Sequence, residues 1–313
     1  MKNERQELAA EPLAVAPDLR LIEKLAHWRN LGLLAIAIVL VFSLPLFDLA
    51  KFAAASDLYS YILLIPLASG YLIWLKWKAL PQSSGPARKT AVAFGAGGLA
   101  VLAGYALIRH STFKLAEADY LLFMMSAFLL FLTGGCWWFL GREVVRALAF
   151  PIGFLVFMVP MPTVLLDGIT SGLQLGSAWA AHMFFSLVGA TFLRDGLIFH
   201  LPGINVAVAP ECSGIHSSLV LLISSSIASY LFLRSPWKRA VFVLAVIPLA
   251  LLRNGFRVFV IGELCTHIGP EMVDSPIHHQ GGPLFFALSL IPFFLLLYFL
   301  RRSERSVKKS QAQ

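Results

Sequence analysis

Charged residues are scarce in this sequence. They make up 13% of its 313 residues, whereas soluble proteins carry about 25%. Hydrophobic residues make up 58%, and long apolar runs recur along the chain. The deficit of charge excludes an ordinary soluble domain and indicates a polytopic membrane protein. The net charge of +8 is no sign of nucleic-acid binding, because membrane proteins collect basic residues in their cytoplasmic loops.

Cysteine is also rare, and the three cysteines are too few for a disulfide framework. The sequence lacks a metal-ligand cluster, a phosphate-binding loop and any cofactor motif, so we expect no metal and no cofactor. Residues 1–30 are mixed and charged and lack the apolar core of a signal peptide, which predicts a cytoplasmic N-terminal tail.

Eight apolar stretches approach the ~20 residues that a helix needs to cross a bilayer. They cover residues 31–47, 58–75, 91–108, 120–140, 144–159, 214–233, 240–261 and 283–300. Basic residues follow every second stretch and precede the first, which places both termini in the cytoplasm. We therefore predict N-terminal transmembrane helices over 31–143, a core that holds the polar motifs over 144–300, and a basic cytoplasmic tail over 301–313.

The segment between the fifth and sixth stretches is too long for a simple turn. Gly168, Gly172 and Gly176 are spaced four residues apart and share one helix face, which allows close helix contact. This face is either an ordinary packing surface or the wall of a groove for a substrate helix. The period then changes, and 197–201 and 204–208 around Pro202-Gly203 predict a small β-hairpin. A hairpin cannot lie bare in lipid, so we expect it at the outer surface.

Polar residues that suit catalysis gather toward the predicted outer face. They are Cys212 at the start of the sixth stretch, Arg253, Asn254 and Arg257 in the seventh, and His278 and His279 before the eighth. An arginine within a span is costly and marks a functional site by default. Arg257 is the sharper candidate because it lies nearer the outer surface. Arg253 lies one helical turn deeper, and we expect it to tolerate lysine.

Cysteine, histidine and arginine together suit acyl transfer on a peptide bond. The thiolate is the nucleophile, and a helix N-terminus and an arginine lower the thiol pKa whereas apolar surroundings raise it. The sequence does not decide which influence is larger. A histidine accepts the thiol proton or protonates the leaving amine, and an arginine stabilises the oxyanion.

The identity of the histidine is open from chemistry alone. His216 follows Cys212 by four residues, so one helical face can hold both, whereas His278 and His279 are distant in sequence. Cys136 and Cys265 are expected to be inert apolar residues. A disulfide between Cys265 and Cys212 would instead remove the nucleophile.

Three motifs resemble those of the exosortase/archaeosortase family of integral membrane proteins, whose chemistry is similar to that of sortases. They read Glu211-Cys212-Ser213-Gly214, Asn254-Gly255-Phe256-Arg257, and His278-His279-Gln280-Gly281-Gly282-Pro283-Leu284-Phe285-Phe286. Their order and spacing match, as does the hairpin before the cysteine, and the resemblance is strongest over residues 150–300. The sequence departs from the pattern in its doubled histidine.

The resemblance implies that Cys212 is the nucleophile, Arg257 the second catalytic residue and His278 the third, with His279 as the alternative. It implies a cysteine transpeptidase of the inner membrane that faces the exterior and cleaves a C-terminal sorting signal. Such a signal combines a short motif of the Pro-Glu-Pro type, one helix and a basic tail. The product would pass through an acyl-enzyme to an acceptor of unknown identity, for surface or exopolysaccharide attachment. The partners are thus sorting-signal proteins and the bilayer, without nucleic acid.

Two other functions fit the same composition. One is a non-enzymatic transporter or assembly factor whose intramembrane arginines line a pathway, although the inverted repeat of many transporters is not evident. The other is a membrane protease that passes the acyl group to water.

Overall fold

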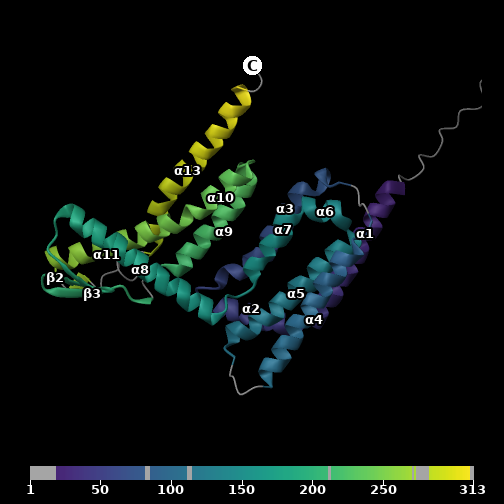
Figure 1. Cartoon of the computed structure of the whole chain (residues 1–313), viewed down its shortest axis with the longest axis horizontal. Helices are drawn as coiled ribbons and strands as arrows, with labels where there is room; N and C mark the ends of the chain where they lie inside the picture. Colours follow the sequence, from purple (N-terminus) through teal and green to yellow (C-terminus); the bar gives the residue numbers. More distant parts are fainter. Residues whose placement is uncertain are drawn as a thin grey trace, which may run out of the picture. The chain divides into compact units, whose positions relative to one another are not determined.

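The computed structural model describes residues 19–81, 85–110, 115–210, 213–269, 271–272 and 282–310. Across these ranges the chain is helical apart from one small sheet. It divides into two compact units, one of residues 1–52 and 62–160 and the other of residues 53–61 and 161–313. Figure 1 follows the elements of both units along the sequence.

In the described ranges, six helical segments are long and apolar enough to cross a membrane. They are Ser60–Ala79, Arg88–Arg109, Glu117–Phe139, Ile215–Phe232, Pro236–His267 and Gly282–Glu304. Two bent helix pairs pass the same test when each pair is taken as one span, which raises the number to eight. The predicted class, an all-α polytopic membrane protein with a small β element, is therefore confirmed.

The first unit is built around a pair of long helices. Its elements are α1 (Leu19–Val41), most of α2 (Ser43–Ala55), α3 (Ile65–Lys76), α4 (Arg88–Arg109), α5 (Glu117–Phe139), α6 (Gly141–Ala147), α7 (Ala149–Phe154) and the 3-10 turns η2 (Trp77–Ala79) and η3 (Leu155–Met158). Small residues let α4 and α5 approach closely: a methyl group on Gly98 would lie 2.9 Å from the Phe131 ring, and one on Gly134 would lie 3.1 Å from the Ala91 carbonyl oxygen. Glycine at such positions is typical of helix pairs in membranes.

Two predicted spans are broken, and proline explains both breaks. The chain turns by 72° between α1 and α2, because Pro45 lacks the N–H that would bind the carbonyl of Val41 and continue the helix. The expected continuous span over 144–159 is instead α6, α7 and η3. Pro151 lacks the N–H that would bind the Ala147 carbonyl, and this carbonyl accepts a hydrogen bond from Lys76 Nζ at 3.0 Å instead. The η3 turn ends at Met158 and the next helix begins at Thr163, with Pro160 and Pro162 between them. The segment between the fifth and sixth predicted stretches begins with a 26-residue helix, α8 (Thr163–Val188).

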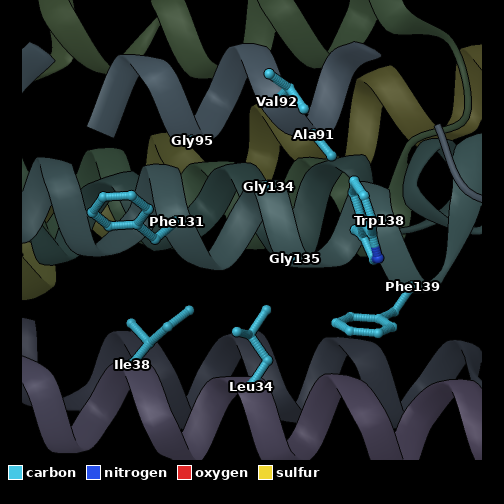
Figure 2. A pocket seen from close by; sticks show the side chains of 10 residues that line it. All are labelled: Leu34, Ile38, Ala91, Val92, Gly95, Phe131, Gly134, Gly135, Trp138 and Phe139. Atoms are coloured by element: carbon cyan, nitrogen blue, oxygen red, sulfur yellow. The ribbon is translucent and has the colours of Figure 1, made fainter. Parts of the chain in front are cut away.

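An apolar pocket of about 420 Å³ opens between α1, α4 and α5. Figure 2 shows Leu34 and Ile38 on α1 opposite Phe131, Trp138 and Phe139 on α5. Gly134 and Gly135 leave its floor without side chains. Its lining offers no carboxylate, thiol or basic group, and this pocket holds none of the predicted motifs.

The second unit contains all three motifs. Its elements are α8, the strands β1 (Leu193–Asp195), β2 (Ile198–Leu201) and β3 (Ile204–Ala207), and the helices α9 (Ile215–Phe232), α10 (Pro236–Leu244), α11 (Val246–His267) and α13 (Gly282–Ser310). Figure 1 shows the sheet beside α8 and α11. A buried cluster joins these elements through Phe185 of α8, Phe199 and Leu201 of β2, and Val258 of α11.

The predicted hairpin is present and gains a third strand. The sheet order is β1-β2-β3, with antiparallel pairs throughout. Leu201 pairs with Ile204 across Pro202-Gly203, and Gly203 has φ +83°, a value that glycine adopts without strain. Phe199 and Leu201 are buried whereas Ile198 is exposed, so the alternation that predicted strands also identifies the face that packs on the helices.

Candidate active site

The strand that leads toward Cys212 is held at its end by α8. The Val208 N–H donates to the carbonyl of Leu197 at 2.9 Å. Gln174 of α8, itself buried, donates from Nε2 to the Val208 carbonyl oxygen at 2.8 Å. The chain position four residues before Cys212 is therefore fixed by a buried hydrogen bond between side chain and backbone. Glu211 and Cys212 themselves lie outside the described residues.

The turn that follows Cys212 is tight and buried. The Ser213 N–H donates to the Pro210 carbonyl at 3.0 Å, and Ser213 is only 1% exposed. Gly214 has φ +72° and forms the N-cap of α9. Its carbonyl oxygen accepts the N–H of Ser218 at 3.0 Å and the Ser218 hydroxyl at 2.7 Å. The first turn of α9 is thus organised around this one carbonyl group, two residues after the predicted nucleophile.

Helix α11 brings the second motif against this turn. Arg253 is 8% exposed, and its Nη2 donates to the Gly214 carbonyl oxygen at 3.3 Å and to the Ser218 hydroxyl at 3.4 Å. A methyl group on Gly214 would lie 3.0 Å from this Nη2 and 3.2 Å from Oδ1 of Asn254. Glycine is required here for two reasons, the positive φ and the close approach of α11. The first two motifs, about forty residues apart in sequence, therefore meet at Gly214.

A second glycine explains why α11 lies where it does. A methyl group on Gly255 would lie 2.9 Å from the Ser177 carbonyl oxygen and 2.8 Å from the Ala181 nitrogen of α8. The missing side chain lets the two backbones approach, and Asn254 Nδ2 then reaches the Ser177 hydroxyl at 2.9 Å. Both Asn254 and Ser177 are buried. The asparagine of the motif consequently has a structural contact, since it ties α11 to α8 beside the turn.

Of the predicted site residues, Arg257 is described and lies on α11 one helical turn after Arg253, half-buried. Cys212, His278 and His279 lie outside the described residues, so their predicted roles stay predictions. The alternative histidine, His216, lies in the first turn of α9 and is exposed.

The other two cysteines, and His182 of α8, pack against their surroundings. Cys136 and Cys265 are buried free thiols, which agrees with the inert role expected for them. The His182 ring meets the Phe192 ring edge-on, with centroids 5.0 Å apart. Within the described ranges, no group of three metal-ligating side chains comes together.

The three glycines of α8 that are spaced four residues apart differ in how closely they pack against other helices. A methyl group on Gly176 would lie 2.7 Å from the Leu251 side chain of α11, so Gly176 belongs to the close contact with α11. Gly168 and Gly172 have no such neighbour within 4 Å among the described residues. The three glycines share one helix, as predicted, and of the three only Gly176 lies close to a neighbouring helix.

Comparison with known proteins decides the family. The model of the transmembrane exosortase family matches residues 53–295, which is well over half of the chain and includes all three motifs. The chain belongs to the transmembrane exosortase family. No curated protein and no solved structure matches it. The family is one of membrane cysteine peptidases and transpeptidases, and membership supports a role of that general type for this exosortase.

Sequence reasoning missed Gln174 and the contacts of Arg253. Gln174 appears in the sequence as a single amide in an apolar helix, and Arg253 was named among the polar residues of the seventh stretch, without a partner and with the expectation that it tolerates lysine. The signal for both was present, because a polar side chain that is buried in an apolar segment needs a partner. The identity of that partner required the packing of α8, α9 and α11.

Proposed function

We propose that this exosortase is a cysteine transpeptidase of the inner membrane that processes exported proteins at the outer face. Its substrates carry a C-terminal sorting signal with a Pro-Glu-Pro-type motif, an apolar helix and a basic tail. The substrate helix packs against the enzyme within the bilayer, which delivers the motif to Cys212. The proposal is supported by the contact of the first two motifs at Gly214, because Arg253 and Asn254 lie beside a residue that follows Cys212 by two positions in the sequence.

Cys212, His278 and Arg257 are the catalytic residues in this proposal. The Cys212 thiol gives its proton to His278, and the sulfur attacks the carbonyl carbon of the scissile peptide bond. Arg257 donates to the oxygen on which negative charge develops, since a guanidinium stays charged in a poorly solvated site. The carbon–nitrogen bond then breaks, and His278 returns the proton to the leaving amine. The resulting thioester is resolved by a nucleophile of the acceptor, which takes the acyl group and releases the thiol.

The test uses the full chain expressed with a reporter protein that ends in motif, helix and basic tail. Cys212→Ala is expected to abolish processing while the enzyme remains inserted and abundant. Mass spectrometry of the reporter's new C-terminus then separates the functions: an added acceptor indicates transpeptidation, and a free carboxylate indicates a protease that uses water. Full processing by Cys212→Ala would contradict the cysteine mechanism and favour the non-enzymatic class.

A further inference from the structure

The apolar pocket of the first unit has the width of a single hydrocarbon chain. Its lining on α5 runs from Phe131 to Phe139, which is about 12 Å along a helix axis. Spread over this length, the volume of about 420 Å³ gives a mean cross-section of about 35 Å². A helix with its side chains is about 10–12 Å across and covers more than twice that area. The pocket is therefore too narrow for a helix, whereas a flexible chain of methylene groups fits.

The pocket is left open by a glycine and opens on the surface of the unit. Gly95 of α4 lines it (Figure 2), and a methyl group there would meet no described neighbour within 4 Å. Val92 and Trp138, which also line the pocket, are 61% and 42% exposed. Since α4 and α5 are both long and apolar enough to cross a membrane, the surface at this opening faces hydrocarbon rather than water.

The pocket carries positive charge at its end nearest the start of α4. Arg88, the first residue of α4, holds its guanidinium carbon 5.9 Å from the centroid of the Trp138 ring. The Ala87 N–H donates to the Trp137 carbonyl at 3.1 Å, which fixes the start of α4 beside the end of α5. Lys89 follows directly, and both cations are exposed. Neither forms an ion pair with another residue in the described part of the chain.

These two cations lie where a helix disfavours positive charge. The first turn of α4 contains no acidic residue, and its N-cap, Ala87, provides no side-chain hydrogen bond. The N–H groups of this turn therefore add to the positive charge of Arg88 and Lys89. The first acidic residue after α5 is Glu143, and it already pairs with Arg146 at 3.9 Å. An anion at this end of the pocket would interact favourably with both cations and with the helix terminus.

We propose that the pocket binds an anionic phospholipid of the bilayer, with one acyl chain in the pocket and the headgroup phosphate at Arg88 and Lys89. Trp138 fits this arrangement, because tryptophan collects at the level of the headgroups. The distribution of basic residues predicts that this end of α4 is cytoplasmic, and basic pockets between transmembrane helices on that side bind acidic headgroups. The inference concerns the first unit alone and does not depend on the proposed transpeptidase.

The experiment counts bound lipid and needs no turnover. The purified full chain in detergent is titrated with phosphatidylglycerol or with phosphatidylcholine, and native mass spectrometry counts the lipids that remain bound. We expect one phosphatidylglycerol per chain at concentrations where phosphatidylcholine is not retained. Each cation near an anionic lipid surface corresponds to about a five-fold change in affinity. The double variant Arg88→Gln/Lys89→Gln should therefore bind phosphatidylglycerol about 25-fold more weakly, whereas Arg109→Gln, at the other end of α4, should bind it like the wild type.

A second pair of variants tests the acyl chain. Gly95→Leu places a side chain in the pocket without a close neighbour at its methyl position, so it should abolish retention of phosphatidylglycerol while Tm stays near that of the wild type. Gly104→Leu is the matched control. Gly104 lies on the same helix, also has no described neighbour within 4 Å and does not line the pocket, so this variant should retain the lipid.

Three results would overturn the proposal. Equal retention of the two lipids, or wild-type affinity in Arg88→Gln/Lys89→Gln, would remove the acidic headgroup. Wild-type retention in Gly95→Leu would remove the acyl chain from the pocket. A dimer of the wild type that Gly95→Leu abolishes would assign the pocket to a second copy of the chain. If Gly95→Leu does not fold, glycerophosphoglycerol, which is the same headgroup without acyl chains, is added to the wild type: failure to displace phosphatidylglycerol at equal concentration supports the acyl-chain site, and displacement overturns it.

Discussion

Gly214 has a positive φ and two close neighbours on α11, so Gly214→Ala is the most informative single change. A non-glycine residue in the left-handed region costs roughly 1–2 kcal/mol. The added methyl group also lies 3.0 Å from Nη2 of Arg253 and 3.2 Å from Oδ1 of Asn254, which is closer than such contacts tolerate. One of these neighbours must shift by a few tenths of an ångström.

That shift removes a hydrogen bond. Nη2 donates to the Gly214 carbonyl at 3.3 Å, which is long for an N–H···O hydrogen bond, so a small retreat breaks the contact. A hydrogen bond contributes about 0.5–1.5 kcal/mol net. Together with the backbone strain, the expected loss in the free energy of unfolding is roughly 1.5–3.5 kcal/mol.

Gly203→Ala is the matched control. Gly203 also has a positive φ, +83°, but a methyl group there meets no described atom within 4 Å. It should therefore cost only the backbone strain of roughly 1–2 kcal/mol. Thermal unfolding followed by tryptophan fluorescence, together with peptide turnover, compares the two variants. We expect a larger fall in Tm and an on the order of 10²-fold slower turnover for Gly214→Ala. Equal behaviour of the two variants would refute the argument that α11 constrains the turn.

The other expected outcomes concern chemistry and helix packing. Arg257→Lys should insert normally and process the reporter at least ~100-fold more slowly, because lysine lacks the planar donor pair; near-wild-type processing would make Arg257 a structural residue. His278→Ala should lose most activity and His216→Ala less, and a result in which His216→Ala alone is inactive would replace the predicted histidine. Gly255→Val should lower Tm sharply, since its side chain collides with the α8 backbone, whereas Gly172→Val, with no described neighbour within 4 Å, should not. Equal Tm values for the last two variants would contradict the close contact of α8 and α11.

Much of the fold follows from local sequence features. Apolar runs predicted the membrane helices over 91–108, 120–140 and 214–233 because the length of a spanning helix is set by the bilayer, and the structure places α4, α5 and α9 at these positions. Pro202-Gly203 predicted the hairpin turn because glycine after proline is typical of turn geometry. Hydropathy did not predict the breaks before α2 and α8. The mean hydropathy of an apolar run is the same whether its helix is continuous or broken by proline.

The motifs were readable from the sequence because cysteine, arginine and histidine are rare in apolar segments and costly there. The contacts between the motifs could not be predicted from the sequence. The contact of Gly214 with Arg253 and Asn254 joins residues forty positions apart, and Gly255 lets the same helix, α11, approach α8. The sequence by itself determined the polytopic helical class, the hairpin and the family, since apolar runs, turn residues and motifs are local features. The tertiary structure alone decided that Gln174 contacts Val208 and that Arg253 contacts Gly214, since side-chain partners depend on how three helices pack.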